Sequence, residues 1–141
     1  DDLRATVHTF KGHAQSTGIV GCVGYCLGGK LAFLMATRSN VDAAVGYYGV
    51  GLDTLLGEAG AIKKPLLLHI AEEDKFVNKD AQKKIKEGLF PNPHVTMYSY
   101  EGMNHAFTRL NGEHYDAEAA AIANERTDAF LEHTLKQAKA D

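Results

Sequence analysis

A cysteine stands at the centre of a glycine-framed turn early in this chain of 141 residues. The segment Gly24-Tyr25-Cys26-Leu27-Gly28 follows the apolar run from Gly18 to Val23 and precedes apolar residues at helical spacing. A nucleophile between two glycines at a strand-to-helix turn is the pattern of a nucleophile elbow, in which small neighbours let the strand and the helix pack closely. The positive end of the helix favours a thiolate there. The pattern predicts a nucleophilic Cys26, and an ordinary turn with a buried, inert cysteine is the alternative.

Candidates for an acid and a base follow along the chain. The apolar run from Lys64 to Ala71 leads into an acidic turn that ends at Asp74. A second run, Val95 to Tyr100, alternates like a strand and leads into a loop that carries His105. In elbow folds the nucleophile, the acid and the histidine follow in this order, each at the carboxyl end of a strand. We therefore predict Asp74 as the acid and His105 as the base.

Several short motifs in this order carry a resemblance that extends over nearly the whole chain. They are Gly24-Tyr25-Cys26-Leu27-Gly28-Gly29, Val45-Gly46-Tyr47-Tyr48-Gly49-Val50-Gly51, Asp74-Lys75-Phe76-Val77 and His105-Ala106-Phe107. Together they resemble the dienelactone hydrolase family of α/β-hydrolases, and the cysteine in the elbow is the most specific element. The resemblance implies a catalytic triad of Cys26, Asp74 and His105. It further implies that Arg109 holds the carboxylate of an anionic lactone and that Tyr48 borders the pocket.

The chemistry expected of such a site is hydrolysis of a small-molecule ester or enol-lactone. Cys26 would attack the acyl carbon, His105 would move the proton, and Asp74 would fix the imidazole tautomer. The backbone N–H of Leu27 would donate one hydrogen bond to the oxyanion, and the second donor is expected from a loop outside this chain. A thiol suits a weakly basic leaving group such as an enolate, because an amide would tend to expel the thiolate instead.

Strands and helices are expected to alternate. The predicted helices cover about 2–15, 27–38, 78–89 and 115–136, with a short turn near 53–56, and the predicted strands cover 19–24, 42–47, 65–71 and 94–100. This alternation predicts a three-layer α/β/α fold with a mainly parallel sheet. In the last helix, Asp116 is the expected N-cap, and the expected buried stripe comprises Ile122, Phe130, Leu131 and Leu135.

The first predicted strand is apolar on both faces, as is typical of a strand inside a sheet. We therefore expect residues 1–141 to be the C-terminal portion of a single hydrolase domain whose first strands are absent from this chain. A complete small protein is the alternative. An uncovered edge of this kind favours self-association of the isolated piece.

Composition excludes little beyond this. The net charge of −3 gives no basic footprint for nucleic acid, and no apolar run reaches the ~20 residues of a membrane span. We expect a cytoplasmic protein without a metal or cofactor, and His69 as a buried, hydrogen-bonded residue. In an extended segment the Cα atoms of Cys22 and Cys26 would lie roughly 10–13 Å apart, too far for a disulfide.

Two readings from other functional classes stay open at this point. The chain could be a non-catalytic α/β-hydrolase-like module that keeps the elbow only as scaffold, or a fragment that is inactive by itself. It could also be a thiol-based redox or acyl-carrying protein, although the expected distance from Cys26 to Cys22 leaves no resolving cysteine.

Overall fold

The computed structural model describes residues 2–140 as alternating helices and strands. The elements, in chain order, are α1 (Asp2–Gly12), β1 (Gly21–Tyr25), α2 (Leu27–Arg38), β2 (Ala43–Tyr47), the short 3-10 helices η1 (Leu52–Thr54) and η2 (Leu56–Ala61), β3 (Leu66–Ala71), α3 (Lys79–Leu89), β4 (Val95–Tyr100) and α4 (Ala117–Ala140). Each predicted element is present, with its ends displaced by a few residues.

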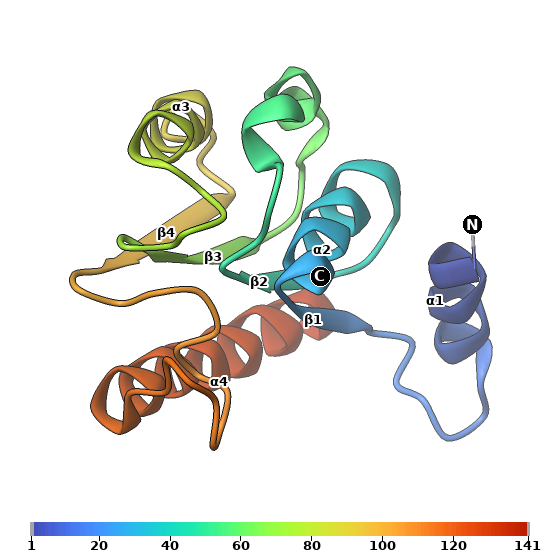
Figure 1. Cartoon of the computed structure of the whole chain (residues 1–141). Coiled ribbons are helices and arrows are strands. Elements are labelled where there is room, and N and C mark those ends of the chain that lie inside the picture. The colour runs from blue at the N-terminus through green and yellow to red at the C-terminus, as the bar shows by residue number, and fades with distance from the viewer. Residues whose placement is uncertain (1, 141) are drawn as a thin grey trace.

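The four strands form one parallel sheet in the order β1-β2-β3-β4. Figure 1 shows α4 on one face of this sheet and α2, the 3-10 segment and α3 on the other, while α1 lies to the side, beyond β1. The predicted three-layer α/β/α fold with a parallel sheet is confirmed. All four strands run in the same direction, so their carboxyl ends meet at one edge of the sheet, where loops can bring distant residues together.

The core fills both faces of the sheet because neighbouring residues of a strand point to opposite sides. On the face covered by α2 and α3, Leu66 and Leu68 of β3 pack with Phe33 and Leu89. On the face covered by α4, Leu67 packs with apolar side chains that include Val45, Phe107 and Ala123. Burial on both faces explains why β2 and β3 read as continuous apolar runs.

Helix α4 is capped as expected, and three of the four predicted stripe residues, Phe130, Leu131 and Leu135, are partly buried against the sheet. The Asp116 carboxylate accepts a hydrogen bond from Ala119 N at 2.9 Å, which confirms the N-cap. The buried positions are Ala120, Ala123, Thr127 and Thr134. The prediction for Ile122 is wrong, because this side chain is 40% exposed. Small residues let α4 lie close to the sheet, and Ile122 projects away from that contact.

Strand β1 lies at an edge of the described sheet. It pairs with β2 alone, and two of its side chains, Val23 and Tyr25, are 41% and 50% exposed. Apolar surface and unpaired backbone groups therefore occur together along this edge, as they do on strands that recruit a partner. Separately, none of the helices within residues 2–140 is long and apolar enough to cross a membrane.

Candidate active site

Cys26 sits at the tight turn between β1 and α2. Its backbone has φ 59° and ψ −118°, a conformation that non-glycine residues rarely adopt. The Cys26 N–H donates to Tyr47 O at 3.1 Å, which fixes the turn against β2. A Cβ atom on Gly24 would lie 1.9 Å from the Gly28 carbonyl oxygen, so the elbow tolerates no side chain at that position. The steric reason predicted for a framing glycine is therefore present in the structure.

Asp74 and His105 form a buried pair beyond the ends of β3 and β4. His105 Nδ1 lies 2.9 Å from Asp74 Oδ2, and the Asp74 side chain is 1% exposed. The other carboxylate oxygen accepts a hydrogen bond from Phe76 N at 2.9 Å. Because a carboxylate can only accept, Nδ1 of His105 is the donor and Nε2 is the nitrogen left for other partners.

The loops that carry this pair are tied together by Asn104, a residue that the sequence reasoning missed. Asn104 Oδ1 accepts hydrogen bonds from Lys75 N at 3.1 Å and from His105 N at 2.6 Å. The ring of Phe76 also meets the His105 ring edge-on, with 4.7 Å between centroids. These contacts hold the imidazole in one orientation. The only sign of Asn104 and Phe76 in the sequence is that Asn104 directly precedes His105 and that Phe76 follows Asp74 by two residues.

The electrostatic surroundings of Cys26 differ from the sequence-based expectation. Burial raises the pKa of the Cys26 thiol above its usual 9.0, the charge of Asp74 raises it further, and the charge of Arg109 lowers it. The thiolate that the helix end was expected to favour is therefore not the favoured form overall, because partial desolvation and the nearby carboxylate favour the neutral thiol. A thiolate at neutral pH would need a base to take its proton.

A cleft of about 270 Å³ opens beside the elbow. Its walls include Cys26, Tyr48, Ala106, Arg109 and Asn124. Three of these residues, Cys26, Tyr48 and Ala106, have positive φ values of 59°, 39° and 64°. Strained backbone of this kind clusters at functional sites, where the surrounding fold holds it in place.

The structure places Arg109 and Tyr48 at the same cleft as Cys26, and their roles toward a substrate stay predictions. Within residues 2–140 the Arg109 side chain has no acidic partner in an ion pair. The Tyr48 hydroxyl forms a hydrogen bond of 2.6 Å with Thr108 Oγ1, and its ring lies 5.2 Å from the His105 ring. Leu27 is the first residue of α2, where a helical N–H has no partner within the helix. Its N–H is therefore available to an oxyanion.

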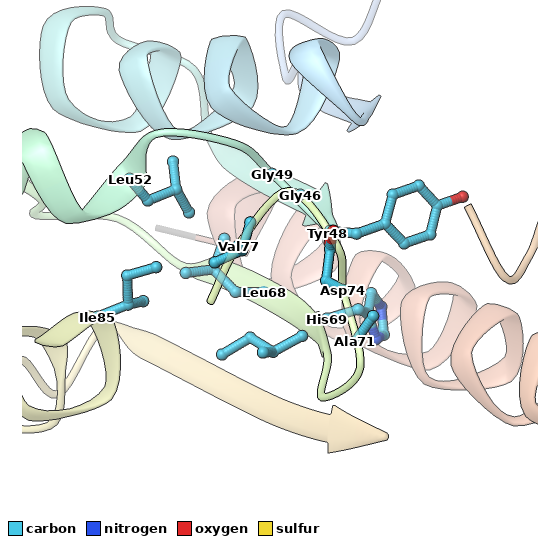
Figure 2. A pocket seen from close by; sticks show the side chains of 11 residues that line it. Gly46, Tyr48, Gly49, Leu52, Leu68, His69, Ala71, Asp74, Val77 and Ile85 are labelled. Atoms are coloured by element: carbon cyan, nitrogen blue, oxygen red, sulfur yellow. The ribbon is translucent and has the colours of Figure 1, made fainter. Parts of the chain in front are cut away.

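A second, smaller cavity lies behind Asp74 and is distinct from this cleft. It measures about 20 Å³, and Figure 2 shows Asp74 and His69 together with apolar side chains such as Leu68, Val77 and Ile85 around it. This is room for about one water molecule and not for an ester. Apolar packing on this side leaves the Asp74 carboxylate little contact with solvent.

Cys22 plays no part in the cleft. Both cysteines are free, as predicted from their separation, and burial raises the pKa of Cys22 to about 11. Among residues 2–140, no three His, Cys, Asp or Glu side chains come together in a way that could hold a metal ion. His69 is buried, and both its ring nitrogens are hydrogen-bonded, as expected.

A cysteine elbow on a parallel sheet, with an aspartate–histidine pair beyond the next strands, has the architecture of an α/β-hydrolase. Residues 1–135 match the model of the dienelactone hydrolase family. The chain is 45% identical over 130 residues to the carboxymethylenebutenolidase of Pseudomonas putida, covering 92% of this chain and 55% of that protein. A relative from Azospirillum brasilense is 54% identical over 109 residues, which cover 77% of this chain and 47% of that relative. This chain therefore belongs to the dienelactone hydrolase family.

Solved structures support the same fold. A dienelactone hydrolase-like promiscuous phosphotriesterase from metagenomic libraries superposes with a TM-score of 0.77 at 24% identity, covering 91% of this chain and 58% of that one. The Pyrococcus furiosus esterase Pf2001 gives a TM-score of 0.75 at 18% identity, covering 95% and 61%. The chain spans about half the length of the relatives it matches. That residues 1–141 form the C-terminal portion of a hydrolase domain stays a prediction.

Proposed function

We propose that this chain carries the catalytic triad of a hydrolase that cleaves a carboxylic ester or an enol-lactone, with Cys26 as nucleophile, His105 as base and Asp74 as the orienting acid. The observations that carry the proposal are the 2.9 Å bond from His105 to the buried Asp74 carboxylate and a cysteine, held at a strained elbow, whose pKa is raised by burial and by the charge of Asp74. Family membership supports the same reaction class. Cytoplasmic location is part of the same proposal.

The proton balance follows from the site. Cys26 rests as a thiol because its pKa is raised, so attack on the acyl carbon is coupled to transfer of the Sγ proton to His105 Nε2. The resulting imidazolium is stabilised by Asp74. Collapse of the tetrahedral intermediate expels the alcohol or enolate, which takes that proton, and leaves a thioester on Cys26. Water, deprotonated by His105, then hydrolyses the thioester, and the thiol returns.

The oxyanion and the substrate's charge are served by different groups. The Leu27 N–H is the proposed first donor to the oxyanion, and a second donor is expected from a segment outside residues 1–141. Arg109 supplies positive charge at the cleft and suits a carboxylate, because a guanidinium can donate two parallel hydrogen bonds. The substrate class we propose is therefore a small ester or lactone that bears a carboxylate.

Matched cysteine variants test the proposal. Cys26→Ala is expected to abolish turnover of p-nitrophenyl acetate, whereas Cys22→Ala, which removes a thiol of the same chemistry from the same strand-to-turn segment, is expected to retain it. Both proteins are checked for folding by circular dichroism. Undiminished turnover by Cys26→Ala would exclude the proposed nucleophile.

A further inference from the structure

A continuous chain of side-chain hydrogen bonds leads from Arg126 of α4, whose guanidinium lies over the rings of Tyr98 and Tyr100 of β4, to the cleft. It runs between the sheet and α4, and each link is between 2.5 and 3.2 Å. Its members, in order, are Arg126, Tyr100, His69, Thr127, Tyr47 and Asn124. The last of these, Asn124, lines the cleft beside Cys26.

The direction of this chain is set at its first member, because a guanidinium can only donate. Arg126 Nη1 donates to the Tyr100 hydroxyl oxygen at 3.2 Å. The Tyr100 proton then has His69 Nδ1, 2.7 Å away, as its acceptor. Burial lowers the pKa of His69 to about 4, so the ring is neutral at pH 7 and its other nitrogen is protonated. His69 Nε2 therefore donates to Thr127 Oγ1 at 2.8 Å.

The same direction continues to the cleft. The Thr127 hydroxyl, which accepts from His69, can donate to the Tyr47 oxygen at 2.5 Å. The Tyr47 proton then goes to Asn124 Oδ1 at 2.8 Å, a shorter contact than the 3.5 Å to Ala123 O. Each hydroxyl in the chain has one donor and one acceptor role filled.

If the donors and acceptors of this chain were reversed, the Tyr100 hydroxyl at the Arg126 end would be left without an acceptor within residues 2–140. If Asn124 donated to Tyr47 and every later bond were reversed, His69 would donate to the Tyr100 oxygen. The Tyr100 hydroxyl would then keep a proton with no acceptor among the described residues, since Arg126 is its only other hydrogen-bond partner there and cannot accept. Tyr100 is 7% exposed, and an unpaired buried hydroxyl is costly.

The amide of Asn124 is consequently fixed with its oxygen turned toward Tyr47. Its NH2 group is the remaining polar end, and within residues 2–140 it has no hydrogen-bond partner. We propose that Asn124 is a substrate-binding residue whose NH2 group donates to a carboxylate oxygen of the substrate, beside Arg109, and that Tyr47 is the positioning residue that holds it so.

This inference rests on the proposed function, because it takes the cleft beside Cys26 as the substrate site. A carboxylate has two oxygens, and Arg109 and Asn124 offer donors to it from different elements, the loop after β4 and helix α4. Arg109 would supply the positive charge that attracts the substrate carboxylate, and the fixed amide of Asn124 would set the orientation of that carboxylate. Together they would select an acyl group that carries its carboxylate at a set distance from Cys26.

Protection of Cys26 from alkylation tests the inference without requiring turnover. Glutarate, a dicarboxylate that the enzyme does not consume, is titrated against the rate at which iodoacetamide labels Cys26. Glutarate is expected to slow labelling of the unsubstituted protein. In Asn124→Leu the half-protecting glutarate concentration is expected to rise about tenfold or more, the range for loss of one hydrogen bond to a charged group. In Tyr47→Phe it rises less, because the amide is present but free to turn.

The matched control is Asn40→Leu, the same change at an exposed asparagine outside the cleft, which is expected to leave protection unchanged. Unaltered protection in Asn124→Leu, or no protection of the unsubstituted protein, would overturn the inference. If Asn124→Leu does not fold, Asn124→Asp keeps the bond from Tyr47 and replaces the donor by an anionic oxygen. Protection retained by Asn124→Asp contradicts the inference equally. Failure of the proposed function would appear separately, as ester turnover that survives Cys26→Ala.

Discussion

Acid is expected to destabilise this fold through His69. Burial, and to a smaller extent the positive charge of Arg126, lower the pKa of the His69 imidazole from 6.5 to about 4. The unfolded chain therefore binds more protons than the folded one between these pH values, and the free energy of unfolding falls as pH falls across that window. The stability is fully present above pH 6.5 and is lost progressively down to pH 4. The full difference corresponds to about 3 kcal/mol, of which roughly 2.5 kcal/mol is lost by pH 4.5.

Urea unfolding at 25 °C, at pH 7.5 and pH 4.5, measures this loss. His69→Gln keeps a donor and an acceptor on the side chain but does not titrate, so its free energy of unfolding is expected to fall by roughly 2.5 kcal/mol less between the two pH values. Asp42 and Glu58, whose pKa values are lowered by hydrogen bonds and cations, lose their contribution mainly below their usual 3.8 and 4.5. They are present in both proteins and cancel in the comparison. An equal loss in both proteins would refute the reasoning.

Three further outcomes are expected. His105→Ala should lower ester turnover by several orders of magnitude, and Asp74→Asn nearly as much, without the two losses adding in the double variant; a fully active Asp74→Asn protein would mean that another group orients the histidine. Arg109→Ala should reduce kcat/KM for a carboxylate-bearing ester about tenfold or more and leave that for p-nitrophenyl acetate within about twofold, and equal losses would remove Arg109 from the binding role. The isolated 141 residues should self-associate through the edge that exposes Val23 and Tyr25, and light scattering that finds a monodisperse monomer would contradict this.

The sequence predicted the fold well because its signals are local. The apolar runs of β2 and β3 end at polar loops, and a glycine-framed turn allows few conformations. The order in which Cys26, Asp74 and His105 follow along the chain, each after a strand, predicts that they lie at the same edge of the sheet, because parallel strands end together.

What the sequence did not predict depends on contacts between distant segments. Ile122 was placed in the buried stripe of α4 by its hydrophobicity, whereas close approach to the sheet selected alanine and threonine. The raised pKa of Cys26 arises from burial and from Asp74, neither of which a turn motif reveals. Asn124 is one polar residue in an alanine-rich helix, and its helical spacing from Thr127 was the only sign that both side chains reach Tyr47 of β2.

The most direct test of the account is to find the acyl group during turnover. The protein is mixed with p-nitrophenyl acetate, quenched in acid within the first turnovers, digested and analysed by tandem mass spectrometry, which separates Cys22 from Cys26 when both occur in one peptide. The account predicts an acetyl group on Cys26 and none on Cys22, with the adduct persisting longer in Asp74→Asn, where the histidine is poorly oriented for hydrolysis of the thioester. Steady turnover with no acetyl group on Cys26, or with the label on another residue, would contradict the central claim.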